Sequence, residues 1–225
     1  MRQVQICEVG PRDGLQNAKQ LMPTGTKKAW ISARAAAGLN EIEVGSFVPP
    51  KLIPAMADTG EVVKHALTIS GLKVVALAPN VKGFERARAA GAHKITFPVS
   101  ASHQHSVANV RMTPDQMIEE VRKAASMRSG KGPEIEGAVS TAFGCTMQGS
   151  VPEDEVVRIA LKLAGEVEGV RPCAAREVHL REVGVGEAGE LDSGRAGLVR
   201  QLVHLFRVHR VEEHLGIARA VVDFQ

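Results

Sequence analysis

Residues 8–17 read EVGPRDGLQN and mark the point at which a short apolar strand gives way to a loop. The β-prone run over residues 4–9 stops at a Gly-Pro pair, so Arg12 and Asp13 fall just past the carboxyl end of a strand. In a parallel α/β barrel, that end of the strands forms the active face. The stretch therefore predicts a barrel strand with polar chemistry at its tip.

An arginine next to an aspartate suits metal-assisted carbon–carbon cleavage. The carboxylate of Asp13 can hold a hard divalent cation, and the guanidinium of Arg12 can meet a developing enolate or a carboxylate with a planar fork of donors. The alternative for an isolated Arg-Asp-Gly is a solvated turn closed by Gly14.

Composition indicates one soluble globular domain. The chain has 225 residues, is 44% hydrophobic and carries a formal charge of +3. It contains neither an apolar run near ~20 residues nor a signal-peptide pattern, so we expect a cytoplasmic protein with no membrane partner. Cys7, Cys145 and Cys173 are odd in number and widely spaced, which argues against a disulfide framework. Scattered charge and the single Trp30 disfavour nucleic acid.

Strand-like and helix-like segments alternate along the chain. This order calls for a parallel sheet with helical crossovers, and six such units are fewer than the eight of a closed barrel. We therefore predict an α/β fold, a (β/α) TIM-type barrel that is incomplete by about two units. The expected strands are 3–9, 39–47, 72–78, 94–99, 134–142 and 175–183, and the expected helices are 25–37, 55–67, 82–90, 114–129, 153–167 and 197–214.

The second and fifth of these strands carry polar candidates. In LNEIEVGSF, alternation places Glu41, Glu43 and Gly45 on one face and Ser46 on the other. Glu43 is an acid/base or positioning group if it points into the barrel, and a solvated glutamate if it points outward. After the fifth strand, small hydroxyl-bearing residues such as Thr141 either leave room for a ligand or simply pack.

Four separated segments closely resemble hydroxymethylglutaryl-CoA lyase, of the TIM-barrel metallolyase superfamily. The resemblance covers residues 3–164 and implies a divalent cation, Mg²⁺ or Mn²⁺, an acyl-CoA substrate, and cleavage to acetoacetate and acetyl-CoA. It also implies a role in leucine degradation and ketone-body metabolism. The segments are EVGPRDGLQN, AGLNEIEVGSFVPPKLIPAMAD, LAPNVKGFERARAAGA and STAFGCTMQG.

The resemblance also implies roles for individual residues. Asp13 matches the family's metal-binding aspartate, and Arg12 matches the arginine that stabilises the acetyl-CoA enolate. Glu43 matches an active-site glutamate that supports both. Three further residues match positions at or near the substrate site: Gln16, Lys19 and Ser46.

The resemblance ends near Ala164. The family's His-x-His metal ligands, its glycine-rich cysteine loop and its metal-binding asparagine have no counterpart in residues 165–225, a segment without lysine, threonine, asparagine or methionine. We interpret residues 1–164 as the lyase-like barrel segment. The rest is an atypical segment, either read out of frame or divergent, and sequencing the gene across the junction tests this.

The remaining histidines are weaker candidates for metal ligands. His103 and His105 follow the fourth strand, in a segment that we read as a loop with solvated or substrate-adjacent side chains. His179 and Arg181 would share a strand face, where a packed or solvated histidine is the simpler interpretation. Cys145 has no neighbouring base in sequence and is read as structural or ligand-lining.

Three functions remain open at this stage. The first is the metal-dependent lyase, and the second is a Claisen-type acyl-CoA synthase of the same superfamily. The third is a truncated, non-catalytic chain that binds acyl-CoA or a partner subunit. Because an incomplete barrel exposes strand edges, we also expect a homo-oligomer.

Overall fold

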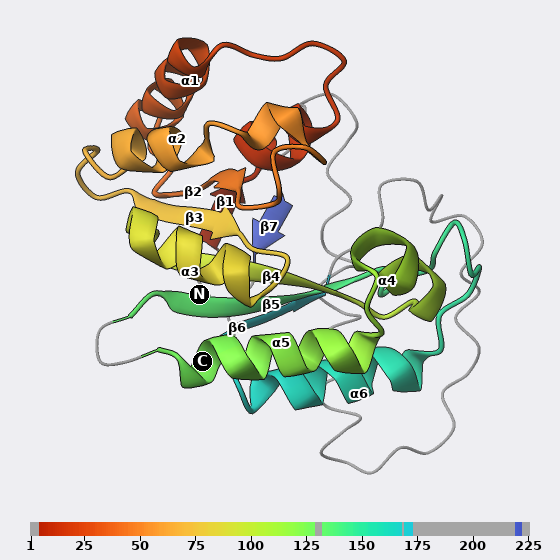
Figure 1. Cartoon of the computed structure of the whole chain (residues 1–225). Coiled ribbons are helices and arrows are strands. Elements are labelled where there is room, and N and C mark those ends of the chain that lie inside the picture. The colour runs from red at the N-terminus through yellow and green to blue at the C-terminus, as the bar shows by residue number, and fades with distance from the viewer. Residues whose placement is uncertain (1–4, 129–131, 168, 173–218, 222–225) are drawn as a thin grey trace.

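The computed structural model describes residues 5–128, 132–167, 169–172 and 219–221, and these form an α/β half-barrel (Figure 1). Its strands lie in the order β6-β5-β4-β3-β2-β1-β7, and β1 to β6 are parallel neighbours. The strands are β1 (Gln5–Glu8), β2 (Glu41–Ser46), β3 (Lys73–Leu77), β4 (Lys94–Ser100), β5 (Glu134–Ser140), β6 (Gly169–Pro172) and β7 (Arg219–Val221).

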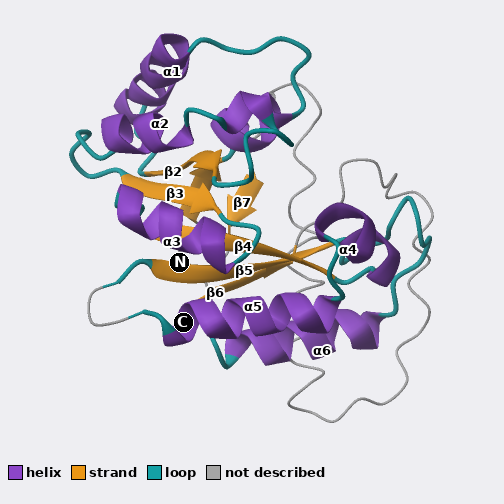
Figure 2. Ribbon diagram, in the orientation of Figure 1, coloured by secondary structure: helices purple, strands orange, loops and turns teal. Residues whose placement is uncertain are grey.

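Helices connect the parallel strands and cover one face of the sheet (Figure 2). The α/β prediction is thus confirmed, with six parallel strands in place of a closed barrel. The helices are α1 (Thr24–Ala36), α2 (Thr59–Ala66), α3 (Val81–Ala90), α4 (His103–Val110), α5 (Pro114–Ser126) and α6 (Glu153–Ala164), with a π-helical turn η1 (Gly10–Gly14) and a 3-10 turn η2 (Pro54–Met56).

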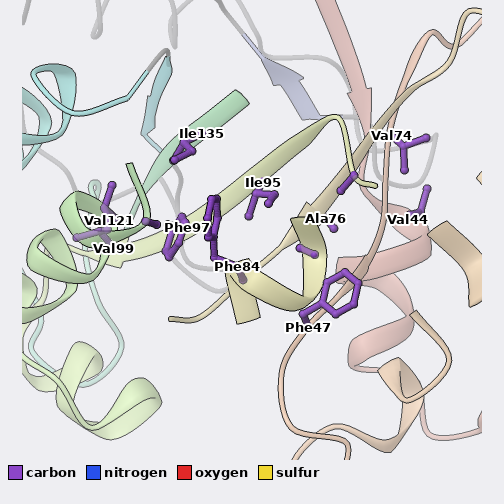
Figure 3. Close-up of a cluster of buried hydrophobic side chains, with 14 of the residues drawn as sticks. Val44, Phe47, Val74, Ala76, Phe84, Ile95, Phe97, Val99, Val121 and Ile135 are labelled. Carbon is purple, nitrogen blue, oxygen red and sulfur yellow. The ribbon is translucent and has the colours of Figure 1, made fainter. Parts of the chain in front are cut away.

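The main hydrophobic core lies between the sheet and these helices (Figure 3). Alternate residues of β2 to β5 point into it, including Val44 of β2, Ala76 of β3 and Phe97 of β4. The residues between them face the concave side, where Cys7, Val9 and Val75 form a small separate cluster. The concave side is the inside of the half-barrel, here called the lumen face.

Five segments differ from the prediction or lie beyond it. Residues 103–110 form α4 instead of a loop, because the Ser102 side chain caps the helix by accepting a hydrogen bond from the His105 N–H at 3.1 Å. The strand β6 was not predicted, nor was β7, which pairs antiparallel with β1. The expected strand 175–183 and helix 197–214 lie outside the described residues.

The fold thus brings the carboxyl ends of β1, β2, β4 and β5 to one rim of the half-barrel, where the predicted site residues lie. In the part of the chain that the structure describes, no helix has the length and apolar character needed to cross a membrane.

Candidate active site at the carboxyl ends of the strands

Arg12 and Glu43 form a buried ion pair on the lumen face. The chain turns sharply after β1, with the Asp13 N–H donating to the Val9 carbonyl at 2.7 Å, and this turn (η1) directs Arg12 inward. Arg12 is 8% exposed and Glu43 is fully buried. Nε of the guanidinium donates to Oε2 of Glu43 at 2.8 Å, and Nη2 forms an ion pair with the same oxygen at 2.6 Å.

This geometry resolves two alternatives that the sequence left open. Arg12 does not belong to a solvated turn, and Glu43 does not point outward to solvent. The third nitrogen of the guanidinium, Nη1, donates to Oδ1 of Asp13 at 3.0 Å, so Arg12 links the two carboxylates. A charged donor held in a desolvated place by fixed partners can stabilise negative charge that develops in a reaction.

The predicted face of Ser46 is wrong, because β2 contains a β-bulge. Its pairing with β3 shifts between Glu43 and Gly45, so that Gly45 lies opposite Ala76 of the helix-facing core and Ser46 lies opposite Leu77. A Cβ on Gly45 would come within 2.6 Å of the Thr59 hydroxyl on α2, which confirms that Gly45 faces the helices. Ser46 therefore shares the lumen face with Glu43.

Thr59 on α2 stabilises the bulge from the helix side of the sheet. Its hydroxyl accepts from the Ser46 N–H at 3.2 Å and lies 3.1 Å from the Ser46 carbonyl and 2.8 Å from the Met56 carbonyl. Thr59 thereby gives the Ser46 N–H a partner on the helix side of the bulge.

A second polar cluster lies on the same rim, at the ends of β4 and β5. Thr141 has φ +58°, a strained conformation for a β-branched residue, and is 1% exposed. Its hydroxyl is 2.9 Å from the Ser100 hydroxyl, 2.9 Å from the Ser102 N–H and 2.6 Å from the Ser140 carbonyl. The hydroxyl ties the two strand ends together, and contact of Thr141 with substrate stays a prediction.

The other predicted residues lie less deep. Gln16 is half-buried and Lys19 is exposed, both in the segment that follows η1. The structure thus brings Arg12, Asp13 and Glu43 together by direct contacts and adds Ser46 on the same face.

Cys145 follows β5 and is buried. Burial raises the pKa of its thiol, but hydrogen bonds from the Ser102 hydroxyl and from the N–H groups of Gln148 and Met147 together outweigh burial and lower the pKa below its usual value. The structural or ligand-lining interpretation of Cys145 remains a prediction.

His105 belongs to the same rim cluster, with Nδ1 3.1 Å from the Ser100 hydroxyl. Desolvation lowers the pKa of its imidazole from the ordinary value of 6.5, so we expect His105 to be neutral at pH 7. In an NMR titration, the His105 resonance, assigned by its loss in His105→Gln, should shift with a midpoint below 6.5. A midpoint at or above 6.5 would contradict this environment.

A buried charge cluster that was not predicted from the sequence lies at the amino-terminal ends of the strands. Lys94 of β4 donates to Glu41 of β2 at 2.9 Å and to Glu136 of β5 at 3.4 Å, and all three side chains are at most 5% exposed. The sequence feature that could have predicted this cluster is a charged residue at a lumen-facing position of each of two largely apolar strands. These are Lys94 in KITFPVS and Glu136 in EIEGAVS. The lumen therefore carries ion pairs at both ends.

The described residues do not by themselves supply the ligands that a divalent cation needs. Among the described residues, no group of three or more His, Cys, Asp or Glu is placed to hold a metal ion. Asp13 supplies one carboxylate at the rim, and that carboxylate also accepts from Arg12. Hard cations such as Mg²⁺ take about six oxygen ligands.

The chain matches known proteins over most of its length. The HMGL-like family model matches residues 3–172. Mitochondrial hydroxymethylglutaryl-CoA lyase from Bos taurus is 33% identical over 89% of this chain and 60% of its own length. The cytoplasmic 3-hydroxy-3-methylglutaryl-CoA lyase of Mus musculus is 34% identical over 84% of this chain and 53% of its own.

Solved structures of bacterial HMG-CoA lyases are also similar. The enzyme from Bacillus subtilis superposes with a TM-score of 0.75 at 28% identity, over 91% of this chain and 65% of its own. The enzyme from Acinetobacter baumannii was solved in complex with coenzyme A and 3-methylmalate. It gives a TM-score of 0.72 at 34% identity, over 75% of this chain and 55% of its own. The chain spans about half to two thirds of the length of these relatives.

Proposed function

This chain belongs to the HMGL-like family of lyases, and from that premise we propose that it cleaves 3-hydroxy-3-methylglutaryl-CoA to acetoacetate and acetyl-CoA. The 3-hydroxyl loses its proton, the carbon–carbon bond breaks, and a ketone forms on the acetoacetate side. The electron pair of the broken bond passes to the acetyl-CoA enolate, which then takes up a proton. No water or oxidant is consumed.

The buried Arg12–Glu43 pair is the observation that carries the proposal. One hydrogen bond and one ion pair join Arg12 to a single oxygen of Glu43, so the guanidinium is held in place before any substrate binds. We assign Arg12 to the enolate oxygen, where a preorganised cation in a desolvated site lowers the barrier most. Glu43 positions Arg12, and Gln16, Lys19, Ser46 and Thr141 belong to the proposed substrate side of the rim.

A divalent cation, Mg²⁺ or Mn²⁺, enters the proposal only through Asp13, as one carboxylate ligand of a site that the described residues do not complete. Its chemistry would be to polarise substrate oxygens. No step above depends on it.

An acetoacetate assay tests the proposed function directly. The full chain is incubated with 3-hydroxy-3-methylglutaryl-CoA, with and without added Mg²⁺ or Mn²⁺, and acetoacetate is measured. We expect the wild-type chain to release acetoacetate and the Arg12→Gln variant to release none. Release should be unchanged in the control Arg122→Gln, which alters an exposed arginine on α5 that pairs with Glu119. No release under any condition would contradict the lyase.

The second candidate is an acyl-CoA-binding protein without turnover. It is favoured by the described residues, which do not by themselves supply enough ligands for a metal ion. Binding of acetyl-CoA in a calorimetric titration, combined with no acetoacetate in the first assay, would select it.

A further inference from the structure

Glu8 is a buried carboxylate to which the proposed reaction assigns no role. It is the last residue of β1 and is 7% exposed. In the sheet it lies opposite Ile42, which belongs to the helix-facing core, so the Glu8 side chain points away from the lumen and towards α1. Burying a carboxylate is costly unless the carboxylate is paired, so the partners of Glu8 indicate what it does.

The first partner of Glu8 is the turn that carries Arg12. Oε1 of Glu8 accepts a hydrogen bond from the N–H of Gly10, the first residue of η1, at 2.7 Å. The first N–H groups of a helical turn point away from the rest of the turn and need acceptors from elsewhere. The N–H groups of Arg12 and Asp13 find theirs in the Val9 carbonyl. Glu8 supplies the acceptor for Gly10.

Helix α1 holds this carboxylate against the turn. Arg34 of α1 forms an ion pair with the other oxygen of Glu8 at 3.5 Å, and its guanidinium lies 5.9 Å from the centre of the Trp30 ring. A Cβ on Gly10 would lie 2.8 Å from Oε1 of Glu8 and 3.0 Å from Cη2 of Trp30. The space beside Gly10 is thus closed, which restricts where the turn can lie.

The turn in its place determines where the Arg12 guanidinium lies. Arg12 follows Gly10 within η1, and the Nε of its side chain donates to Glu43 of β2 at 2.8 Å. The tip of the side chain is therefore fixed by Glu43 and its backbone by the turn. A displacement of about 1 Å in a group that acts on reacting atoms can cost about 10²-fold in rate.

We propose that Glu8 is a positioning residue for Arg12, acting through the Gly10 N–H from the helix side of the sheet. The proposal rests on the proposed function for the reaction that Arg12 serves. Because Arg12 is assigned to charge that develops only in the transition state, loss of its position lowers kcat and leaves KM nearly unchanged.

Two substitutions of Glu8 test this role with two readouts, the Arg12 Nε–H resonance in a ¹⁵N NMR spectrum and the lyase kinetics of the full chain. The resonance is assigned by its loss in Arg12→Gln. We expect Glu8→Met to shift the resonance and to lower kcat about tenfold to a hundredfold at a similar KM. Glu8→Gln keeps an oxygen that accepts from Gly10, so both readouts should return to near wild type.

Glu61→Met is the matched control. Glu61 is also a glutamate that pairs with a cation of α1, Lys28 at 2.6 Å, but it lies on α2. Both of its readouts should equal those of wild type. If Glu8→Met does not fold, Glu8→Asp takes its place, because the shorter side chain keeps the negative charge but withdraws the carboxylate from Gly10. We expect the same shift of the Arg12 resonance.

The outcomes separate the positioning role from the proposed function. An Arg12 resonance that stays in place in Glu8→Met or Glu8→Asp, or a fall in kcat that is as large in Glu8→Gln as in Glu8→Met, would overturn the role of Glu8. A resonance that shifts in Glu8→Met and returns in Glu8→Gln supports that role, even if wild type releases no acetoacetate and the proposed function fails.

Discussion

Arg12→Met lowers the free energy of unfolding by about 3–5 kcal/mol, because it leaves Glu43 as a fully buried carboxylate without its cation. The loss reflects the stranded charge more than the intrinsic value of the pair, since two buried ions gain little net free energy over a well-packed apolar pair. In the proposed lyase, the same substitution also removes the group assigned to the enolate, for which we expect a fall in kcat of about 10²–10³-fold.

A double-mutant cycle separates these causes. Urea unfolding is measured for Arg12→Met, Glu43→Gln and the double variant, and we expect the double variant to be more stable than the sum of the single losses predicts. Its activity should remain as low as that of Arg12→Met. Additive stability losses would mean that Arg12 and Glu43 do not interact in the folded protein.

Lys94→Met has the second-largest expected effect. The Lys94 side chain is 5% exposed and is the cation between Glu41 and Glu136. Its removal leaves two buried carboxylates close together without that positive charge. We expect a loss of about 3–5 kcal/mol in the free energy of unfolding. Because the cluster lies at the end of the strands opposite Arg12, the affinity of the folded fraction for acetyl-CoA should change little.

Lys73→Met serves as the control for Lys94→Met. Lys73 also pairs with a glutamate, Glu134, at 2.9 Å, but the two side chains are 33% and 44% exposed. Solvent-screened pairs of this kind contribute about 0–1 kcal/mol. Equal losses in the two variants would show that the lumen cluster is solvated, against the structure.

Hydrophobic periodicity predicted most elements of the half-barrel. Strands β2 to β5 and helices α1 to α3, α5 and α6 agree with the predicted segments to within a few residues, because each carries a local apolar pattern that the sheet or the helix layer buries. The helix α4 was missed because its signal is the Ser102 cap, which a run rich in serine and histidine conceals.

The candidate site was predictable only in part. Arg12, Asp13 and Glu43 were found from strand-end position and from the resemblance, and the structure joins them by direct contacts. The inward turn of Ser46 depends on Thr59, thirteen residues further along the chain, and no local alternation can show it. The lumen pair of Lys94 and Glu41 spans 53 residues and is visible only once the strands are adjacent.

We propose that the rim of this half-barrel, centred on Arg12, binds the acyl end of a coenzyme A thioester. The most direct measurement is a crystal structure of the chain with acetyl-CoA. We expect the thioester oxygen to lie within hydrogen-bond distance of the Arg12 guanidinium, at about 3 Å, and Arg12 to remain paired with Glu43. A thioester bound away from the carboxyl ends of β1 and β2, or an Arg12 side chain turned out to solvent, would contradict it.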